Sequence, residues 1–270
     1  MRNTQQSTQF TYVHLDAALA VLMRWIEENR KESDLLNNIK EAHIRRVAGF
    51  VCEMGVAEED APLAELIAWL HDLAFYVSDD EENHVHNALE IVFDQGLIYD
   101  LIPAILPKNE IYKIIRKAIK HHGDLLVDRA DMTEREWLHV CIVRDADKLD
   151  NLVHVKPGTS IEDLLRHKKG TDGKSLTEAD LIHGVVSDEV YSTFMSGSTI
   201  NYAIVKTACD WWVAWSAYAF DLLLPESKRL VRESRAIRSF MSRGEFSDPK
   251  TSTRFAAMIA RMDGFLEEQD

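Results

Sequence analysis

Proline and glycine are scarce in this chain of 270 residues, which contains 6 prolines and 11 glycines. No stretch shows the alternation of Val, Ile and Thr with polar residues that is typical of β-strands. Hydrophobic residues make up 46% and charged residues 28% of the chain, which excludes disordered and collagen-like proteins. The sequence therefore predicts a folded, all-α protein.

Cysteine is also rare, and basic residues are outnumbered by acidic ones. Cys52, Cys141 and Cys209 lie far apart without a CxxC pair, so we expect buried free thiols in a reducing compartment. Lys and Arg number 31 against 45 Asp and Glu, and the formal net charge is -14. Because this balance lacks the basic footprint of phosphate-backbone binding, no nucleic acid is expected as a partner.

Long hydrophobic runs are absent as well. The first ten residues are polar, unlike a signal peptide. The most hydrophobic stretch, residues 200–224, is interrupted by Lys206, Asp210 and Asp221, whose charges would be costly in a bilayer. We therefore predict a cytoplasmic protein without a membrane partner, in which residues 200–223 form a buried helix with its aromatic side chains in the core.

Helix-start and helix-end signals recur along the chain, such as Pro62 at a start and Gly96 at an end. They predict helices at residues 35–55, 63–75, 83–96, 109–122, 133–153, from 160, 187–195, 200–223, 227–243 and 247–267. Turn residues gather at 156–174. We predict a polar tail at residues 1–10, a helical core at 11–155 and a C-terminal helical extension at 156–270, packed on the same core.

A histidine and an aspartate lie side by side in the apolar segment AWLHDLAF. Inside an apolar helix, His71 and Asp72 need a polar partner. Adjacent helical side chains point about 100° apart, so both can converge on one divalent metal ion. The alternative is a structural role, with His71 hydrogen-bonded locally and Asp72 on a hydrated edge.

Two more segments complete a pattern around this pair. His43 lies in EAHIRRVA and Asp147 lies in ADKLDNL. The order H, HD, D resembles the HD-domain metal-dependent phosphohydrolases: EAHIRRVA is similar to their H-x-x-RVA segment, WLHDLA to LLHDI and ADKLDNL to AD-[RK]-L. The resemblance covers residues 35–153. It implies an HD-domain helical bundle in which His43, His71, Asp72 and Asp147 bind a metal, with His71 and Asp72 catalytic and Asp72 placed to bridge to a second ion.

The last ligand has two candidates in RDADKLD. Asp145 and Asp147 lie about 200° apart around a helix. Asp145 falls on the apolar stripe of that helix, so periodicity favours it. The family pattern favours Asp147, and we choose Asp147.

Four further histidines are candidates for a second ion. The segment NHVHNALEI resembles the H-x-x-x-G/A-x-E-[LI] pattern of some HD subgroups at His84, and His86 points about 160° away. IKHHGD resembles the HHG segment of two-metal members, so either His121 or His122 fits. One-metal members use comparable histidines to contact phosphate. Nitrogen and carboxylate ligands suit Mn, Fe, Co, Ni or Zn, as one or two ions, with Mg as a further option.

Such a site implies phosphoester hydrolysis by metal-activated water. We expect a phosphomonoesterase or phosphodiesterase acting on a small phosphorylated metabolite, preferably a nucleotide. Arg46, Lys120 and Lys148 flank the expected ligands and are candidates for contact with a phosphate. The alternatives are a mixed-valent di-iron oxygenase of the HD type and a non-catalytic regulatory HD module. The oligomeric state stays open.

Overall fold

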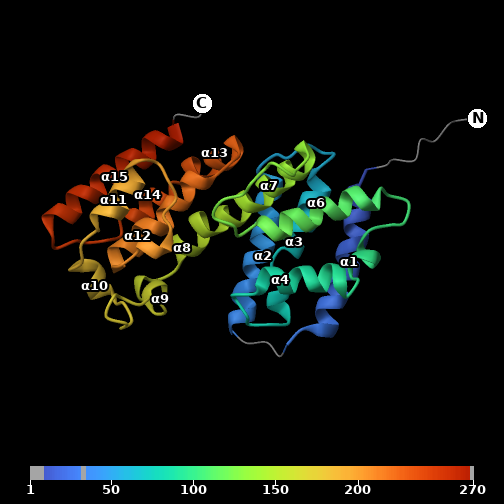
Figure 1. Cartoon of the computed structure of the whole chain (residues 1–270), viewed down its shortest axis with the longest axis horizontal. Coiled ribbons are helices and arrows are strands. Elements are labelled where there is room, and N and C mark those ends of the chain that lie inside the picture. The colour runs from blue at the N-terminus through green and yellow to red at the C-terminus, as the bar shows by residue number, and fades with distance from the viewer. Residues whose placement is uncertain (1–8, 32–34, 268–270) are drawn as a thin grey trace, which may run out of the picture. The chain divides into compact units, whose positions relative to one another are not determined.

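The computed structural model describes residues 9–31 and 35–267, and every regular element in these ranges is a helix (Figure 1). Within them, an isolated antiparallel bridge joins Lys169 and Ser175. The prediction of an all-α fold is confirmed.

The chain divides into two compact units, residues 1–147 and 148–270. The division falls within α7 (Glu134–Asp150). The packing of residues 156–270 on the core of the first unit stays a prediction, and most of the predicted polar tail lies outside the described residues.

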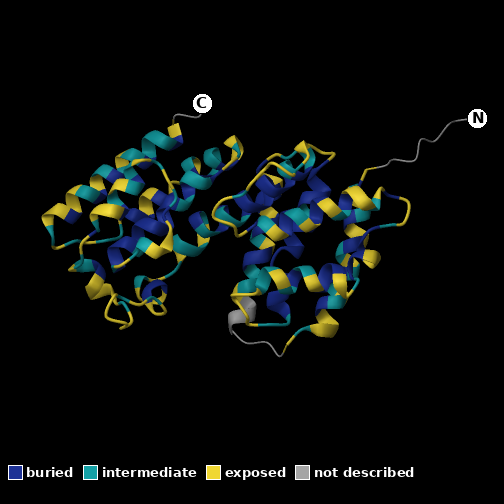
Figure 2. Ribbon diagram, in the orientation of Figure 1, coloured by how far each residue is buried: buried dark blue, intermediate teal, exposed yellow. Residues whose placement is uncertain are grey.

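The first unit is built around α3 (Ala61–Leu70), whose sequence APLAELIAWL is apolar on nearly every side. Pro62 lies in its first turn, where a helix needs no backbone N–H from it. Three helices pack against α3: α1 (Tyr12–Asn29), α2 (Leu35–Glu53) and α6 (Lys108–His121). Because α3 is surrounded, all of its residues except Glu65 are buried (Figure 2).

Helix α6 shows how the sequence directs this packing. Its buried residues recur at helical spacing, which places them on one face of the helix: Ile111, Ile114, Ile115, Ala118 and Ile119. The shorter elements of the unit are η1 (Leu73–Tyr76), α4 (His84–Leu89), η2 (Glu90–Asp94) and α5 (Ile98–Leu101).

The second unit is arranged around α12 (Ala208–Ser216), which packs against α10 (Glu178–Ile182), α11 (Asp188–Met195) and α14 (Ala236–Met241). Its indole rings form the centre of this unit: Trp212 and Trp215 are buried, and the Trp212 ring stacks on Phe240 with centroids 4.2 Å apart. The other elements are η3 (Asn151–Val155), α8 (Lys156–Gly158), α9 (Ile161–Leu165), η4 (Tyr202–Ile204), η5 (Ala217–Asp221), α13 (Pro225–Ser234) and α15 (Pro249–Glu267).

Several predicted helices are interrupted. The helix expected at residues 200–223 is wrong as one element, because Thr207 starts a new helix with its side chain accepting a hydrogen bond from Asp210 N. The helix expected at 227–243 breaks at Arg235, whose φ of 52° is left-handed. Helix α3 ends at Leu70, so His71 and Asp72 leave it instead of continuing to residue 75.

The predictions about the three cysteines and about membrane-spanning helices can be compared with the structure. Cys141 and Cys209 are buried free thiols as expected, but Cys52 is exposed. Cys52 and Glu53 lie between buried Val51 and Met54, so they occupy the outward side at the end of α2. No helix in the described ranges is both long and apolar enough to cross a membrane.

Candidate metal centre

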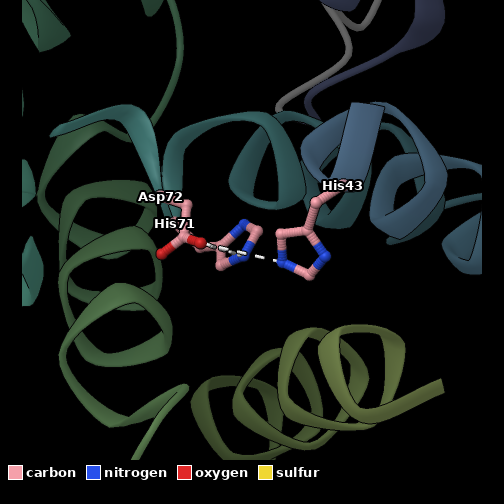
Figure 3. A group of neighbouring side chains, drawn as sticks. All are labelled: His43, His71 and Asp72. Carbon is pink, nitrogen blue, oxygen red and sulfur yellow. Dashed lines mark ion pairs between the residues drawn. The ribbon is translucent and has the colours of Figure 1, made fainter. Parts of the chain in front are cut away.

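Side chains from three helical regions of the first unit meet in its interior. His43 comes from α2, and His71 and Asp72 follow the end of α3 (Figure 3). Asp72 Oδ2 lies 3.7 Å from His43 Nε2 and 3.6 Å from His71 Nε2. Asp147, on α7, places its Oδ1 3.1 Å from His43 Nε2. We call these four residues the first group of candidate ligands.

The other oxygen of Asp72 faces two more histidines. Asp72 Oδ1 lies 3.6 Å from His84 Nε2 and 3.5 Å from His122 Nε2, and the two histidine atoms are 3.3 Å apart. His84 begins α4, and His122 follows α6. Together with Asp72, they are the second group of candidate ligands. Asp72 therefore presents one oxygen to each group, as a bridging carboxylate does.

Three of these histidines are oriented in the same way. The Nδ1 atoms lie 2.7 Å from Ala68 O for His71, 2.7 Å from Glu81 O for His84 and 2.8 Å from Ile119 O for His122. A carbonyl oxygen only accepts hydrogen bonds, so each Nδ1 carries the proton and donates it. In the neutral ring the lone pair is then on Nε2, the atom that faces Asp72 or its neighbours. Histidine ligands of metals are commonly held by such a hydrogen bond.

Two atoms of the first group lack the partners that buried polar atoms require. Within the described residues, His71 Nε2 and Asp72 Oδ1 are buried and have no hydrogen bond, a state that costs about 1 to 3 kcal/mol for each group. The separations of 3.5 to 3.7 Å around Asp72 are close to the roughly 3.4 Å between two ligands of a tetrahedral ion. The residues present therefore fit one or two divalent ions.

The charge states of the first group favour metal binding. Burial lowers the pKa of His71 to about 4, so its imidazole is neutral at neutral pH. Burial alone would raise the pKa of Asp72, but the histidines around it, first His71, hold this pKa well below its usual range. For Asp147, burial is likewise outweighed by a hydrogen bond from His43, and its pKa is lowered. Neutral imidazole and ionised carboxylate are the forms that bind a metal.

The structure separates the remaining candidates from these groups. His121 Nδ1 lies 2.6 Å from Asp124 Oδ2, away from Asp72, and His86 is exposed on α4. Asp145 is fully buried but belongs to neither group. The apolar stripe of α6 is the signal that distinguishes the adjacent histidines, since His122 continues its spacing beyond Ile119 and His121 does not.

Two of the basic residues that flank the expected ligands, Lys148 and Lys120, differ in their surroundings. Lys148 Nζ lies 3.1 Å from Asp221 Oδ2 in the second unit, so its charge is already paired. Lys120 is exposed. A buried arginine that the sequence analysis does not identify is Arg144, which donates from Nη1 to the carbonyl oxygens of His121, at 2.9 Å, and of Asp124. These two hydrogen bonds satisfy backbone carbonyl oxygens at and just after the end of α6, on either side of His122.

Comparison with known proteins gives one match. The family model described as HD domain matches residues 41–152, a span that contains all six residues gathered in the two groups. The comparisons with curated proteins and with solved structures found no match. The described part of this span is helical and holds the H, HD, D pattern in order. Residues 41–152 therefore belong to the HD-domain family.

Proposed function

We propose that this protein is a metal-dependent phosphoester hydrolase that acts on a small phosphorylated molecule, with nucleotides as the first class to test. The observation that carries the proposal is the division of the Asp72 carboxylate, which presents Oδ2 to His43 and His71 and Oδ1 to His84 and His122. Membership of the HD family supports the broader class of metal-dependent hydrolases.

The two ligand groups define which residues would hold the ions. His43, His71, Asp72 and Asp147 would hold one ion, and Asp72, His84 and His122 a second. This mixture of imidazole and carboxylate favours Mn, Fe, Co, Ni or Zn over Ca. Mg, which prefers oxygen ligands and retains several waters, fits less well.

When bound, such ions activate water as a nucleophile near neutral pH and offset the charge of a phosphate. The chain keeps its own ligands ready for this chemistry. Asp72 stays ionised between the two groups because histidines surround it. The Nδ1 hydrogen bonds of His71 and His122 fix the direction of both rings, and both of these residues are buried. None of the six gathered residues is a serine or cysteine, so the geometry favours direct attack by water.

The experiment is hydrolysis of a panel of phosphomonoesters, nucleotides and cyclic nucleotides by the full chain, loaded in turn with Mn²⁺, Co²⁺, Ni²⁺ or Fe²⁺. Asp72→Asn is the control, because it keeps the size of the side chain and removes its charge. We expect phosphate or nucleotide release with at least one metal, and a loss of roughly 100-fold or more in Asp72→Asn.

The same carboxylate bridge would also suit a pair of iron ions. Iron-loaded protein that consumes oxygen and hydrolyses no phosphoester would replace the proposal by an HD-type di-iron oxygenase. Metal binding without either reaction would indicate a regulatory HD module. The three free cysteines support a reducing compartment such as the cytoplasm.

A further inference from the structure

The second unit contains a segment whose charge is opposite to that of the whole chain. The protein carries a formal net charge of -14, but residues 225–243 contain six basic residues and two acidic ones. The basic residues are Lys228, Arg229, Arg232, Arg235, Arg238 and Arg243. The segment forms α13 and α14, which pack against α15 (Figure 1). A local excess of positive charge attracts anions.

These three helices enclose a pocket of about 670 Å³. Arg232, Arg235 and Arg238 line it, and apolar walls come from residues such as Val231 and Met262. Pockets of about 300 to 1,000 Å³ with mainly apolar walls and a few polar groups are typical of small-molecule sites. The pocket has the size of a ligand site, but six of its ten lining residues are charged, so a ligand that fits it has to carry charge as well.

The lining carries three basic and three acidic residues, so its formal charge is zero, but two of the acidic residues are already paired with arginines. Glu233 is paired with Arg229, which lies outside the lining, at 3.0 Å, and Asp263 is paired with Arg238. Glu267 is exposed at the end of α15. The guanidinium of Arg235 is exposed and has no ion pair or hydrogen bond within the described residues. An arginine at the pocket is thus available for a ligand.

The backbone of Arg235 supplies independent support. Its φ of 52° makes it the one non-glycine residue with a positive φ in the described ranges. Side chains disfavour this left-handed conformation, whereas glycine adopts it freely. The turn between α13 and α14 would therefore be more stable with glycine, and the arginine has to be explained by its side chain. Strained residues of this kind concentrate at functional sites.

We propose that this pocket is a second binding site, separate from the HD site, for a small phosphorylated molecule, with Arg235 as the phosphate ligand. The planar guanidinium presents paired N–H donors that match phosphate oxygens. The apolar walls would accommodate the uncharged part of the ligand. The proposal concerns the second unit alone and does not depend on the activity of the first.

The test is calorimetric titration of the full chain with ATP, with inorganic pyrophosphate and with adenosine. The background is the His71→Ala/Asp72→Ala double variant in EDTA, which removes metal-dependent binding at the HD site. We expect saturable binding of ATP or pyrophosphate and none of adenosine. No saturable binding of either phosphorylated probe would overturn the proposal.

Arg235→Gly is the decisive variant, because it removes the guanidinium and suits the left-handed backbone. We expect affinity for the phosphorylated probe to fall at least tenfold, with a melting temperature equal to or above that of the parent. Lys228→Ala removes one positive charge from the same segment but lies outside the pocket lining, and it should leave affinity within about twofold. Equal losses in both variants would indicate general electrostatic attraction and would contradict a defined site.

Discussion

His84 and His86 lie two residues apart on α4 in opposite surroundings. The His84 ring stacks on Phe75 with centroids 5.2 Å apart, and its Nε2 faces Asp72. His86 is exposed. We expect His84→Ala to reduce bound metal by about half, measured by elemental analysis after loading, because it removes a ligand of the second group only. His86→Ala is the control, and equal metal content in the two variants would refute the second group.

Asp145 and Asp147 differ in the same manner on α7. Asp147 contacts His43, whereas Asp145 is fully buried outside both groups. We expect Asp147→Asn to weaken binding of the first ion roughly 10- to 100-fold, since it removes a charged ligand. Asp145→Asn should retain the ion and lower the melting temperature. Titration with Mn²⁺ and thermal melting separate the two effects, and an empty site in Asp145→Asn with unchanged melting would transfer the ligand role to Asp145.

The three cysteines should differ in reactivity toward a thiol reagent. Burial raises the pKa of Cys141 and of Cys209 to about 12, so at pH 8 only about one thiol in 10⁴ is ionised. Cys52 is exposed, although desolvation and the Glu65 carboxylate raise its pKa as well. We expect the native protein to label first at Cys52, faster as pH rises and faster in Glu65→Gln. Rapid labelling of three thiols in the folded protein would contradict the described burial.

At the scale of helices, the C-terminus of α6 depends on Arg144. This residue is 1% exposed and donates to the carbonyl oxygens of His121 and Asp124, on either side of His122. We expect Arg144→Ala to destabilise the protein by about 1 to 3 kcal/mol, because the hydrogen bonds from a buried guanidinium to two backbone carbonyls are lost. We also expect Arg144→Ala to weaken binding of the second ion more than binding of the first.

The measurement for Arg144 is stepwise metal titration together with denaturant unfolding. Arg144→Lys keeps the charge and one donor, so we expect it to recover part of both properties. A variant that loses stability but binds both ions as tightly as the parent would show that Arg144 does not position His122.

The helices also show how far the sequence could predict the structure. The stripe of α6 and the proline of α3 are local signals, and both elements lie close to their predicted places. The break at Thr207 was not predicted, because hydrophobicity alone does not reveal that a threonine and Asp210 will cap a new helix. Helix α1 was not predicted, although Thr11 and His14 form its capping interaction.

The sequence could likewise predict part of the candidate site but not all of it. The order of the motifs along the chain indicates His43, His71, Asp72 and Asp147, because the sequence around each motif predicts a helix. The choice between His121 and His122 could have been made from the apolar stripe of α6, whose spacing His122 continues, and the structure agrees with that choice. The backbone carbonyls that orient the histidines carry no sequence signal of their own.

At the scale of the whole molecule, the ligand groups belong to the first compact unit, residues 1–147. We expect EDTA to leave the helical circular dichroism unchanged, since the ligands are carried by helices with their own hydrogen bonds and packing. A site saturated at 100 times its Kd adds about 2.7 kcal/mol, so chelation should lower the melting temperature by roughly 5 to 10 °C. Loss of helix on chelation would show that folding requires the metal.

The three Nδ1 hydrogen bonds to backbone carbonyls also bear on the choice of ion. Because folding already orients these rings, an incoming ion does not have to organise them, and binding can follow the intrinsic preference of imidazole and carboxylate donors. That preference follows the Irving–Williams order and excludes few transition metals. The metal found in the isolated protein will then reflect the supply during growth, so occupancy and working metal have to be established separately.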